Sequence, residues 1–225
     1  MIVPDKIPFI SYIHSPTRYL WSDFDSYLDE NIPFYLKPFK FVVRNILIKL
    51  RKWDLEAAKK PKLMLANSKN ISRRITKYYH RDSELLYPFV DTKNFVINND
   101  IKKKEFYFMS GRLVPYKHFE IAVEAFNQLK DKVLLIAGSG NQFKILSNKI
   151  KSDNIKMLGK VSFKELIKYY QQARGYIFTS LEDFGITPLE AMACGTPVIA
   201  FGEGGALETV IDEEFNIRNR NGRIQ

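Results

Sequence analysis

Short apolar runs alternate with segments of helical periodicity from residue 106 to residue 201, and this alternation constrains the fold more than any other feature. The apolar runs predict strands at 106–109, 133–137, 155–158, 176–179 and 198–201. The segments between them predict helices at 117–129, 142–150, 162–172 and 187–193. Elements in this order form a parallel, doubly wound α/β sheet. Because such sheets bind ligands beyond the carboxyl ends of their strands, we expect functional residues directly after the strands.

A shorter region of the same kind precedes this sheet. The pattern predicts strands at 7–13, 62–66 and 84–87, a helix over 39–53 and a second helix from the N-cap Ser68 to Tyr79. Residues 96–104, with a run of Asn and Asp followed by three lysines, are typical of a linker. The 225 residues therefore divide into an incomplete α/β domain at 1–95 and a second domain at 96–225.

The positive charge is concentrated in one segment. The whole chain has 35 Lys and Arg against 25 Asp and Glu, whereas residues 33–77 alone hold 13 against 2. A single cysteine, Cys194, excludes an internal disulfide and favours a reducing compartment. No apolar run of about 18 residues predicts a membrane-spanning helix. We expect a cytoplasmic location, peripheral at the inner face of the membrane if the basic segment binds lipid.

Two hypotheses stay open for the basic segment. Residues 39–53 combine an apolar stripe with Lys and Arg, as in a helix that lies on an anionic membrane surface. The same pattern is typical of a helix whose stripe faces a protein core and whose lysines are solvated. Nucleic acid is not expected as a partner, because no nucleic-acid-binding motif accompanies the basic residues.

The first strand of the regular region is followed by Ser-Gly-Arg-Leu-Val-Pro-Tyr-Lys at 110–117. Arg112 supplies a guanidinium fork and Lys117 a point charge, both suited to phosphate oxygens. We expect Lys117 to open the following helix, where a positive helix end also favours an anion. The second strand ends in Gly-Ser-Gly at 138–140, which is incomplete as a dinucleotide fingerprint and predicts a tight turn.

The most specific stretch follows the fourth strand. Glu182 and Glu190 stand eight residues apart around a glycine, Gly185, and a helix start near Pro188. Backbone amides at 185–187 are suited to a diphosphate, and Glu190 to sugar or ribose hydroxyls. The alternative is a solvated acidic loop followed by an ordinary helix. Because Arg112 and Lys117 follow a neighbouring strand, we favour a binding site.

These motifs together resemble glycosyltransferase family 4, whose members are retaining enzymes of the GT-B fold that use nucleotide sugars. The resemblance covers about residues 7–210, and the front segment is similar to a subgroup that transfers mannose or related sugars to cell-surface glycans. It rests on five ordered motifs, at 12–21, 65–68 with 86–91, 110–117, 182–199 and 202–208. The expected fold is thus a Rossmann-like donor domain plus part of a second α/β domain, in a chain truncated at both ends. Residues 217–225 do not resemble the family.

The resemblance implies a role for each candidate residue. Arg112 and Lys117 would neutralise the donor diphosphate, Glu182 would contact the donor sugar, and Glu190 would bind the ribose. Val161 would lie beside the base. The donor pocket would be lined by the backbone of Phe184, Gly185, Ile186 and Thr187. His14 would approach the donor sugar from the acceptor domain.

The implied activity is transfer of a hexose, such as mannose, from a GDP- or UDP-linked sugar to a glycan or lipid-linked acceptor. Family members usually need no metal, which agrees with Arg112 and Lys117 taking the place of a cation. Two retaining routes stay open: a covalent intermediate, or attack on the leaving-group face with Glu182 only holding the sugar. The alternative to an enzyme is an inactive remnant that binds a nucleotide sugar or a protein.

Overall fold

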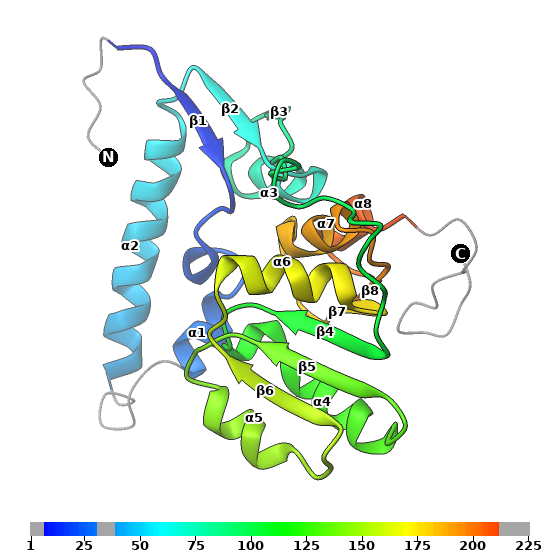
Figure 1. The fold of residues 1–225 in the computed structure, drawn as a ribbon. Coiled ribbons are helices and arrows are strands. Elements are labelled where there is room, and N and C mark those ends of the chain that lie inside the picture. The colour runs from blue at the N-terminus through cyan, green and yellow to red at the C-terminus, as the bar shows by residue number, and fades with distance from the viewer. Residues whose placement is uncertain (1–6, 31–38, 212–225) are drawn as a thin grey trace, which may run out of the picture. The chain divides into compact units, whose positions relative to one another are not determined.

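The computed structural model describes residues 7–30 and 39–211, which form two compact units (Figure 1). The predictions for residues 33–38 and for the tail at 217–225 lie outside the described residues. The units divide between Tyr87 and Pro88, eight residues before the boundary predicted from the sequence. Phe95 explains the difference, because it is buried in the second unit, where its ring contacts Phe163 and Tyr170.

The first unit contains a parallel sheet in the order β1-β2-β3. Its elements are β1 (Ile10–Ile13), the 3-10 turn η1 (Arg18–Leu20), α1 (Phe24–Glu30), α2 (Lys40–Ala58), β2 (Leu63–Ala66), α3 (Lys69–Tyr79) and β3 (Glu84–Leu85). The predicted N-cap of α3 is confirmed, since Ser68 Oγ accepts a hydrogen bond from the Ile71 amide at 3.0 Å. The turn η1 and helix α1 were not predicted.

The second unit contains a five-stranded parallel sheet in the order β6-β5-β4-β7-β8. Its strands are β4 (Phe106–Ser110), β5 (Val133–Ala137), β6 (Ile155–Gly159), β7 (Gly175–Phe178) and β8 (Val198–Ala200). Its helices are α4 (Phe119–Gln128), α5 (Phe143–Lys149), α6 (Phe163–Gln172), α7 (Ile186–Ala193) and α8 (Ala206–Thr209), with the 3-10 turn η3 (Pro115–Lys117) before α4. The predicted doubly wound α/β fold is confirmed.

Helices cover both faces of this sheet, because side chains alternate across each strand. Helices α4 and α5 pack on one face, where Met109, Leu134 and Ile136 are buried. Helices α6 and α7 pack on the other, against Phe108 and Tyr176. Figure 1 shows α6 and α4 on opposite sides of the strands. Parallel strands align their carboxyl ends at one edge, so the segments after β4, β5, β6 and β7 gather there.

Among the residues that the structure describes, no helix combines the length and apolar character needed to cross a bilayer.

Candidate donor-binding site

The segments after β4 and β7 bring Lys117 and Glu182 into direct contact. These strands are neighbours in the sheet, and the Lys117 Nζ lies 2.5 Å from the Glu182 Oε1. The side chains are only 14% and 22% exposed, so solvent screens their attraction less than that of a surface pair. Two residues that are 65 positions apart in the sequence, and that were predicted to serve the same ligand, therefore form one charged unit.

The backbone of Lys117 is held in place by hydroxyl groups from the end of β7. Its carbonyl oxygen accepts hydrogen bonds from Thr179 Oγ1 at 2.9 Å and from Ser180 Oγ at 3.3 Å. Neither residue was given this function from the sequence. The available signal was their position at the carboxyl end of a predicted strand, but nothing local shows which backbone group they reach.

The prediction that Lys117 opens a helix is wrong. Lys117 ends the 3-10 turn η3, and α4 begins two residues later at Phe119. Between them His118 adopts a left-handed conformation with φ 52°, which interrupts the helical path. Lys117 therefore lies outside α4, and His118 separates it from the first turn of that helix.

The loop that carries Arg112 is tied to the turn between β5 and α5. The amide of Leu113 donates to the carbonyl of Ser139 at 2.9 Å. A Cβ atom at Gly138 would lie 1.9 Å from the Gly111 carbonyl oxygen, so the two backbones approach closely only because residue 138 is glycine. Arg112 itself is exposed, and its guanidinium donates a hydrogen bond to Tyr116 Oη at 3.3 Å.

The loop that carries Glu182 rests on a glycine pair in the segment before α8. The Gly205 amide donates to the Glu182 carbonyl at 2.8 Å. Cβ atoms at Gly204 and Gly205 would lie 2.6 Å from the Glu182 oxygen and 2.4 Å from the Phe184 Cα. These glycines therefore determine the path of residues 182–184.

Helix α7 begins at Ile186, two residues before Pro188, with Gly185 as its N-cap at φ 84°. Proline is tolerated at Pro188 because the first turn of a helix lacks intrahelical partners for its amides. Phe184 and Gly185 are buried, whereas Ile186 is exposed. This arrangement directs the positive end of α7 to the edge of the sheet that also holds Lys117 and Glu182.

Glu190 lies one turn into α7 and ends a buried chain of hydroxyl groups. Tyr170 Oη donates to Glu190 Oε2 at 3.0 Å and is also 2.9 Å from Ser110 Oγ. Because Tyr170 has a single hydroxyl proton, Ser110 is the donor in the second bond. Tyr176 Oη continues the chain, 3.2 Å from Ser110 Oγ. Sequence reasoning missed Tyr170, which reads as an ordinary core residue of α6.

The environment of Glu190 predicts a pH-dependent stability. Burial raises the pKa of Glu190, and the hydrogen bond from Tyr170 opposes this shift. The folded chain thus keeps a proton at pH values where the unfolded chain has lost it, so the free energy of unfolding falls as pH rises through this interval. Urea unfolding at several pH values should show this decline in the parent protein and a weaker one in Glu190→Gln.

Tyr170→Phe provides a matched variant for the same measurement. It removes a hydrogen bond that favours the carboxylate and should raise the pKa of Glu190 further. The decline in stability should then extend to higher pH than in the parent. If the free energy of unfolding falls equally steeply with pH in the parent and in Glu190→Gln, this description of Glu190 is wrong.

The two remaining predicted residues belong to other segments of the chain. Val161 follows β6 and is half-buried at the margin of the core on the α6 side. His14 follows β1 in the first unit and is exposed. Its ring meets the Tyr12 ring edge-to-face, with 4.9 Å between the ring centroids. Their roles beside the base and the donor sugar stay predictions.

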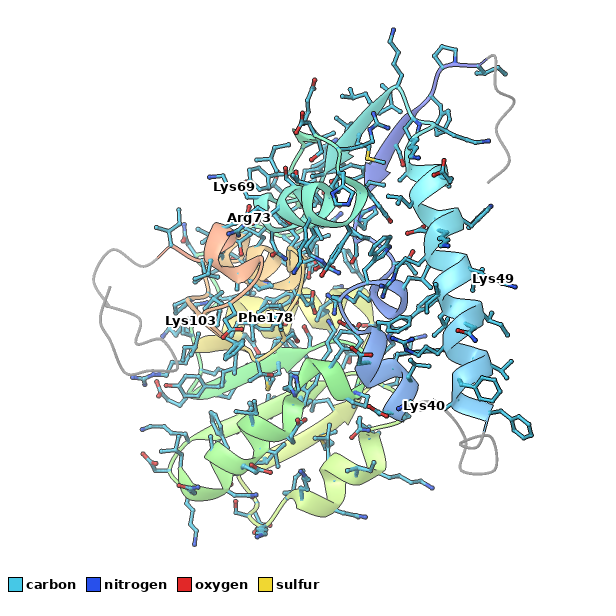
Figure 2. The ribbon with its side chains drawn as sticks, turned by 180° about the vertical axis from the view of Figure 1, so that it is seen from behind. Lys40, Lys49, Lys69, Arg73, Lys103 and Phe178 are labelled. Atoms are coloured by element: carbon cyan, nitrogen blue, oxygen red, sulfur yellow. The ribbon has the colours of Figure 1, made fainter. Side chains whose placement is uncertain are left out.

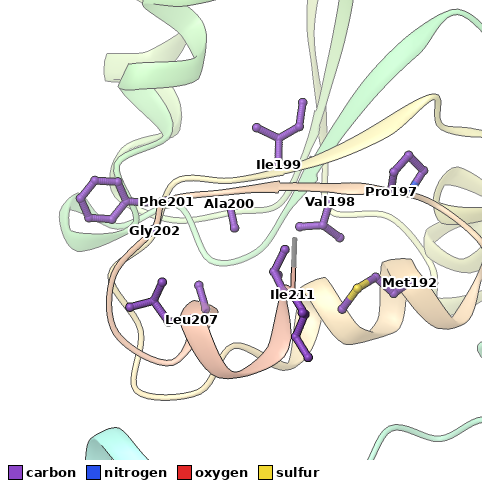
Figure 3. Close-up of a pocket in the computed structure, with 11 residues that line it drawn as sticks. Met192, Pro197, Val198, Ile199, Ala200, Phe201, Gly202, Leu207 and Ile211 are labelled. Atoms are coloured by element: carbon purple, nitrogen blue, oxygen red, sulfur yellow. The ribbon is translucent and has the colours of Figure 1, made fainter. Parts of the chain in front are cut away.

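A separate apolar pocket of about 660 Å³ lies beside the edge strand β8 (Figure 3). It is lined by side chains of β8, α7 and α8, including Met192, Val198 and Leu207. None of the predicted donor-binding residues, all of which the structure describes, lines it. Its lining offers apolar contacts and no charged group, so it does not fit a diphosphate.

Across residues 7–30 and 39–211, no three His, Cys, Asp or Glu side chains are grouped so that they could hold a metal ion. Charged groups at the sheet edge include Lys117, Glu182 and Arg112, beside the start of α7.

The fold is of the GT-B α/β type, and Lys117, Glu182 and Arg112 lie at one edge of its five-stranded sheet. Residues 90–223 match the family described as "Glycosyl transferases group 1", which is more than half of the chain. The chain therefore belongs to the group 1 glycosyltransferases.

Curated relatives of this chain are longer. The chain is 31% identical over 179 residues to the O-antigen chain mannosyltransferase RfbU of Salmonella typhimurium, covering 74% of this chain and 48% of that one. It is 26% identical over 193 residues to the alpha-1,3/1,6-mannosyltransferase ALG2 of Saccharomyces cerevisiae, covering 64% and 38%. The chain thus spans less than half the length of these relatives.

Solved structures agree in fold. The chain matches Anabaena Alr3699/HepE, solved in complex with UDP-glucose, with a TM-score of 0.64 and 21% identity, covering 94% of this chain and 57% of that one. It matches a glycosyltransferase from Rickettsia africae with a TM-score of 0.60 and 20% identity, covering 91% and 60%.

Proposed function

We propose that this chain carries the donor-binding part of a retaining family 4 hexosyltransferase, which takes a hexose such as mannose from a GDP- or UDP-linked sugar. The observation that carries the proposal is the contact between Lys117 and Glu182 at the strand edge beside the start of α7. The names of relatives such as RfbU and ALG2 support mannose as the sugar. The acceptor is a glycan or a lipid-linked glycan.

The charges at this edge suit departure of a nucleoside diphosphate. When the bond to the sugar breaks, negative charge builds on the leaving phosphate and positive charge on the sugar ring. Lys117, Arg112 and the amides at 185–187 stabilise the phosphate charge from fixed positions. An ammonium has three donors, so Lys117 can contact phosphate oxygens and still hold Glu182.

Glu182 and Glu190 have different functions in this proposal. Glu182 accepts hydrogen bonds from the donor sugar and stabilises its positive charge, while Lys117 sets the position of its carboxylate. Glu190 uses the oxygen that does not face Tyr170 to accept from the ribose hydroxyls. Val161 and His14 contribute beside the base and at the donor sugar, as the resemblance implies.

Direct binding of donors tests the proposal without requiring turnover by this chain. Isothermal titration with GDP-mannose, UDP-glucose, GDP and UDP should give binding of at least one sugar donor and its free diphosphate, whereas inorganic phosphate should bind much more weakly. Binding should be unchanged by EDTA, since Lys117 and Arg112 supply the positive charge. Failure of both GDP-mannose and UDP-glucose to bind, or loss of binding in EDTA, would contradict the proposal.

A further inference from the structure

Four hydroxyl side chains form a continuous hydrogen-bonded row beside the first turn of α7; we call this row the hydroxyl chain. From Glu190 it runs through Tyr170 and Ser110 to Tyr176. The Tyr176 hydroxyl is also hydrogen-bonded to the side chain of Thr187, its last member. Because Thr187 and Glu190 are three residues apart in α7, both ends of the row are attached to the same part of that helix.

The protons of the hydroxyl chain all point toward Glu190. Because a carboxylate only accepts, Tyr170 donates to Glu190 Oε2, and Ser110 is the donor to Tyr170. The serine proton is then used, so Tyr176 donates to Ser110, whose Oγ and carbonyl oxygen each lie 3.2 Å away. Hydrogen bonds that run in one direction polarise one another, most strongly where water is excluded, and both tyrosines are fully buried. The hydroxyl chain therefore holds one carboxylate oxygen of Glu190 in place.

The start of α7 is fixed by the same part of the core. Phe178 (labelled in Figure 2) follows Tyr176 on the same face of β7 and is buried. A Cβ atom at Gly185 would lie 3.1 Å from Phe178 Cζ, so the N-cap of α7 packs directly on this ring. Thr187, two residues further on, is held by Tyr176. One buried cluster thus positions both the amides that the proposed function assigns to the diphosphate and the carboxylate that it assigns to the ribose.

The hydroxyl chain leaves the second oxygen of Glu190 for a ligand. Among the described residues, the side-chain hydrogen bond that reaches Glu190 ends on Oε2. Glu190 is only half-buried, whereas Tyr170 behind it is fully buried. A carboxylate with one oxygen fixed presents the other in a defined direction, which is what selection of a hydroxyl-bearing ligand requires.

We infer that Tyr170 is a positioning residue for the ribose of the donor, which holds Glu190 so that its carboxylate distinguishes nucleotides with ribose hydroxyls from nucleotides without them. Ser110 and Tyr176 contribute by orienting the Tyr170 hydroxyl. The inference rests on the proposed function, because it requires that the nucleotide binds at Glu190. If the hydroxyl chain only stabilised the core, its loss would not change the preference for ribose.

Titration of the 225-residue chain with GDP, UDP and their 2′,3′-dideoxy analogues provides the test. The parent should bind a ribonucleotide at least about tenfold more tightly than its analogue, the effect of hydrogen bonds to a charged group. In Tyr170→Phe this ratio should fall by at least about threefold, while affinity for the analogue stays the same. Ser110→Ala removes the donor to Tyr170 but keeps the tyrosine hydroxyl, and it should lower the ratio by about twofold.

Tyr169→Phe is the matched control. Tyr169 is the neighbour of Tyr170 in α6, and its ring stacks on that of Phe108 with 5.2 Å between the ring centroids. This variant should keep the ratio of the parent. Glu190→Ala should remove the preference for ribose, and adding Tyr170→Phe to it should change the ratio no further, because Tyr170 acts through Glu190.

Thermal unfolding shows which variants are folded, and Ser110→Ala decides if Tyr170→Phe is not. The inference would be overturned by an unchanged ratio in the folded variant, by an equal fall in Tyr169→Phe, or by an effect of Tyr170→Phe in the absence of Glu190. A parent that binds GDP or UDP without any preference for ribose would also overturn it. Binding of neither nucleotide by the parent would overturn the proposed function as well, so the two failures are distinct.

Discussion

Lys117→Ala is expected to abolish sugar transfer in the complete enzyme and to weaken binding of the free nucleoside diphosphate by about 10–100-fold, as expected for the loss of a charge-assisted hydrogen bond of about 1.5–3 kcal/mol. The reason is that the Lys117 side chain is only 14% exposed, so its positive charge at the strand edge is weakly screened by solvent. Abolished transfer here means a rate lower by at least about 10²–10³, the typical effect of losing one preorganised group that stabilises developing charge.

Glu182→Ala separates the two members of the pair. It removes the carboxylate that shares Lys117 with the phosphate, so affinity for free GDP or UDP should stay the same or rise. Transfer should nevertheless be lost, because the carboxylate that stabilises the positive charge of the donor sugar is gone. If Lys117→Ala weakens diphosphate binding and Glu182→Ala strengthens it, the Glu182 carboxylate competes with the phosphate for Lys117.

The controls for this pair are available in the same unit. Lys160→Ala removes an exposed lysine that also follows a strand, and it should leave diphosphate affinity unchanged. Thermal unfolding should show that the Lys117 and Glu182 variants are folded. Near-normal transfer in either variant, or equal loss of affinity in Lys160→Ala, would rule out the assignment.

Gly205→Ala is expected to have the second large effect, on stability and on the site together. The added Cβ would lie 2.4 Å from the Phe184 Cα and 2.6 Å from the Asp183 carbonyl, and backbone atoms cannot move aside as a flexible side chain can. Gly205 has an ordinary φ of −70°, so the effect is steric. The free energy of unfolding should fall by about 1–3 kcal/mol, the usual cost of overpacking, and donor affinity should fall because residues 182–184 move.

Gly195→Ala tests whether lower stability alone explains the loss of donor affinity expected for Gly205→Ala. Gly195 has φ 74° and follows α7, where a Cβ would meet the Ile97 side chain at 3.1 Å. The variant should lose about 1–2 kcal/mol of stability from backbone strain while retaining donor affinity, measured by urea unfolding and titration. If Gly195→Ala weakens binding as much as Gly205→Ala, the supporting role of Gly205 is wrong.

The sequence predicted the strands and helices of the second unit because local periodicity encodes them. A strand buried on both faces reads as an apolar run, as at 133–137, whatever surrounds it. The N-cap at Ser68 was also local, since it depends on an amide three residues away. The start of α4 was misplaced because the left-handed conformation of His118 leaves no mark in the hydrophobic pattern.

Periodicity alone could not show which apolar residues of α2 face the core. Leu47 and Ile46 are adjacent in sequence and equally hydrophobic, yet one is buried and the other exposed. The helix can bury only one of its sides against η1 and α1. Which side is buried depends on packing between segments that are separated along the chain.

The sequence by itself determined the alternation of strands and helices, the edge of the sheet where a ligand is expected, and the identity of the charged residues there. Only the tertiary structure decided that Lys117 meets Glu182, that Tyr170 holds Glu190, and that Gly205 supports the Glu182 loop. The physical reason is distance along the chain. Periodicity and caps act within a few residues, whereas these contacts depend on which strands are neighbours and on how closely their connecting segments pack.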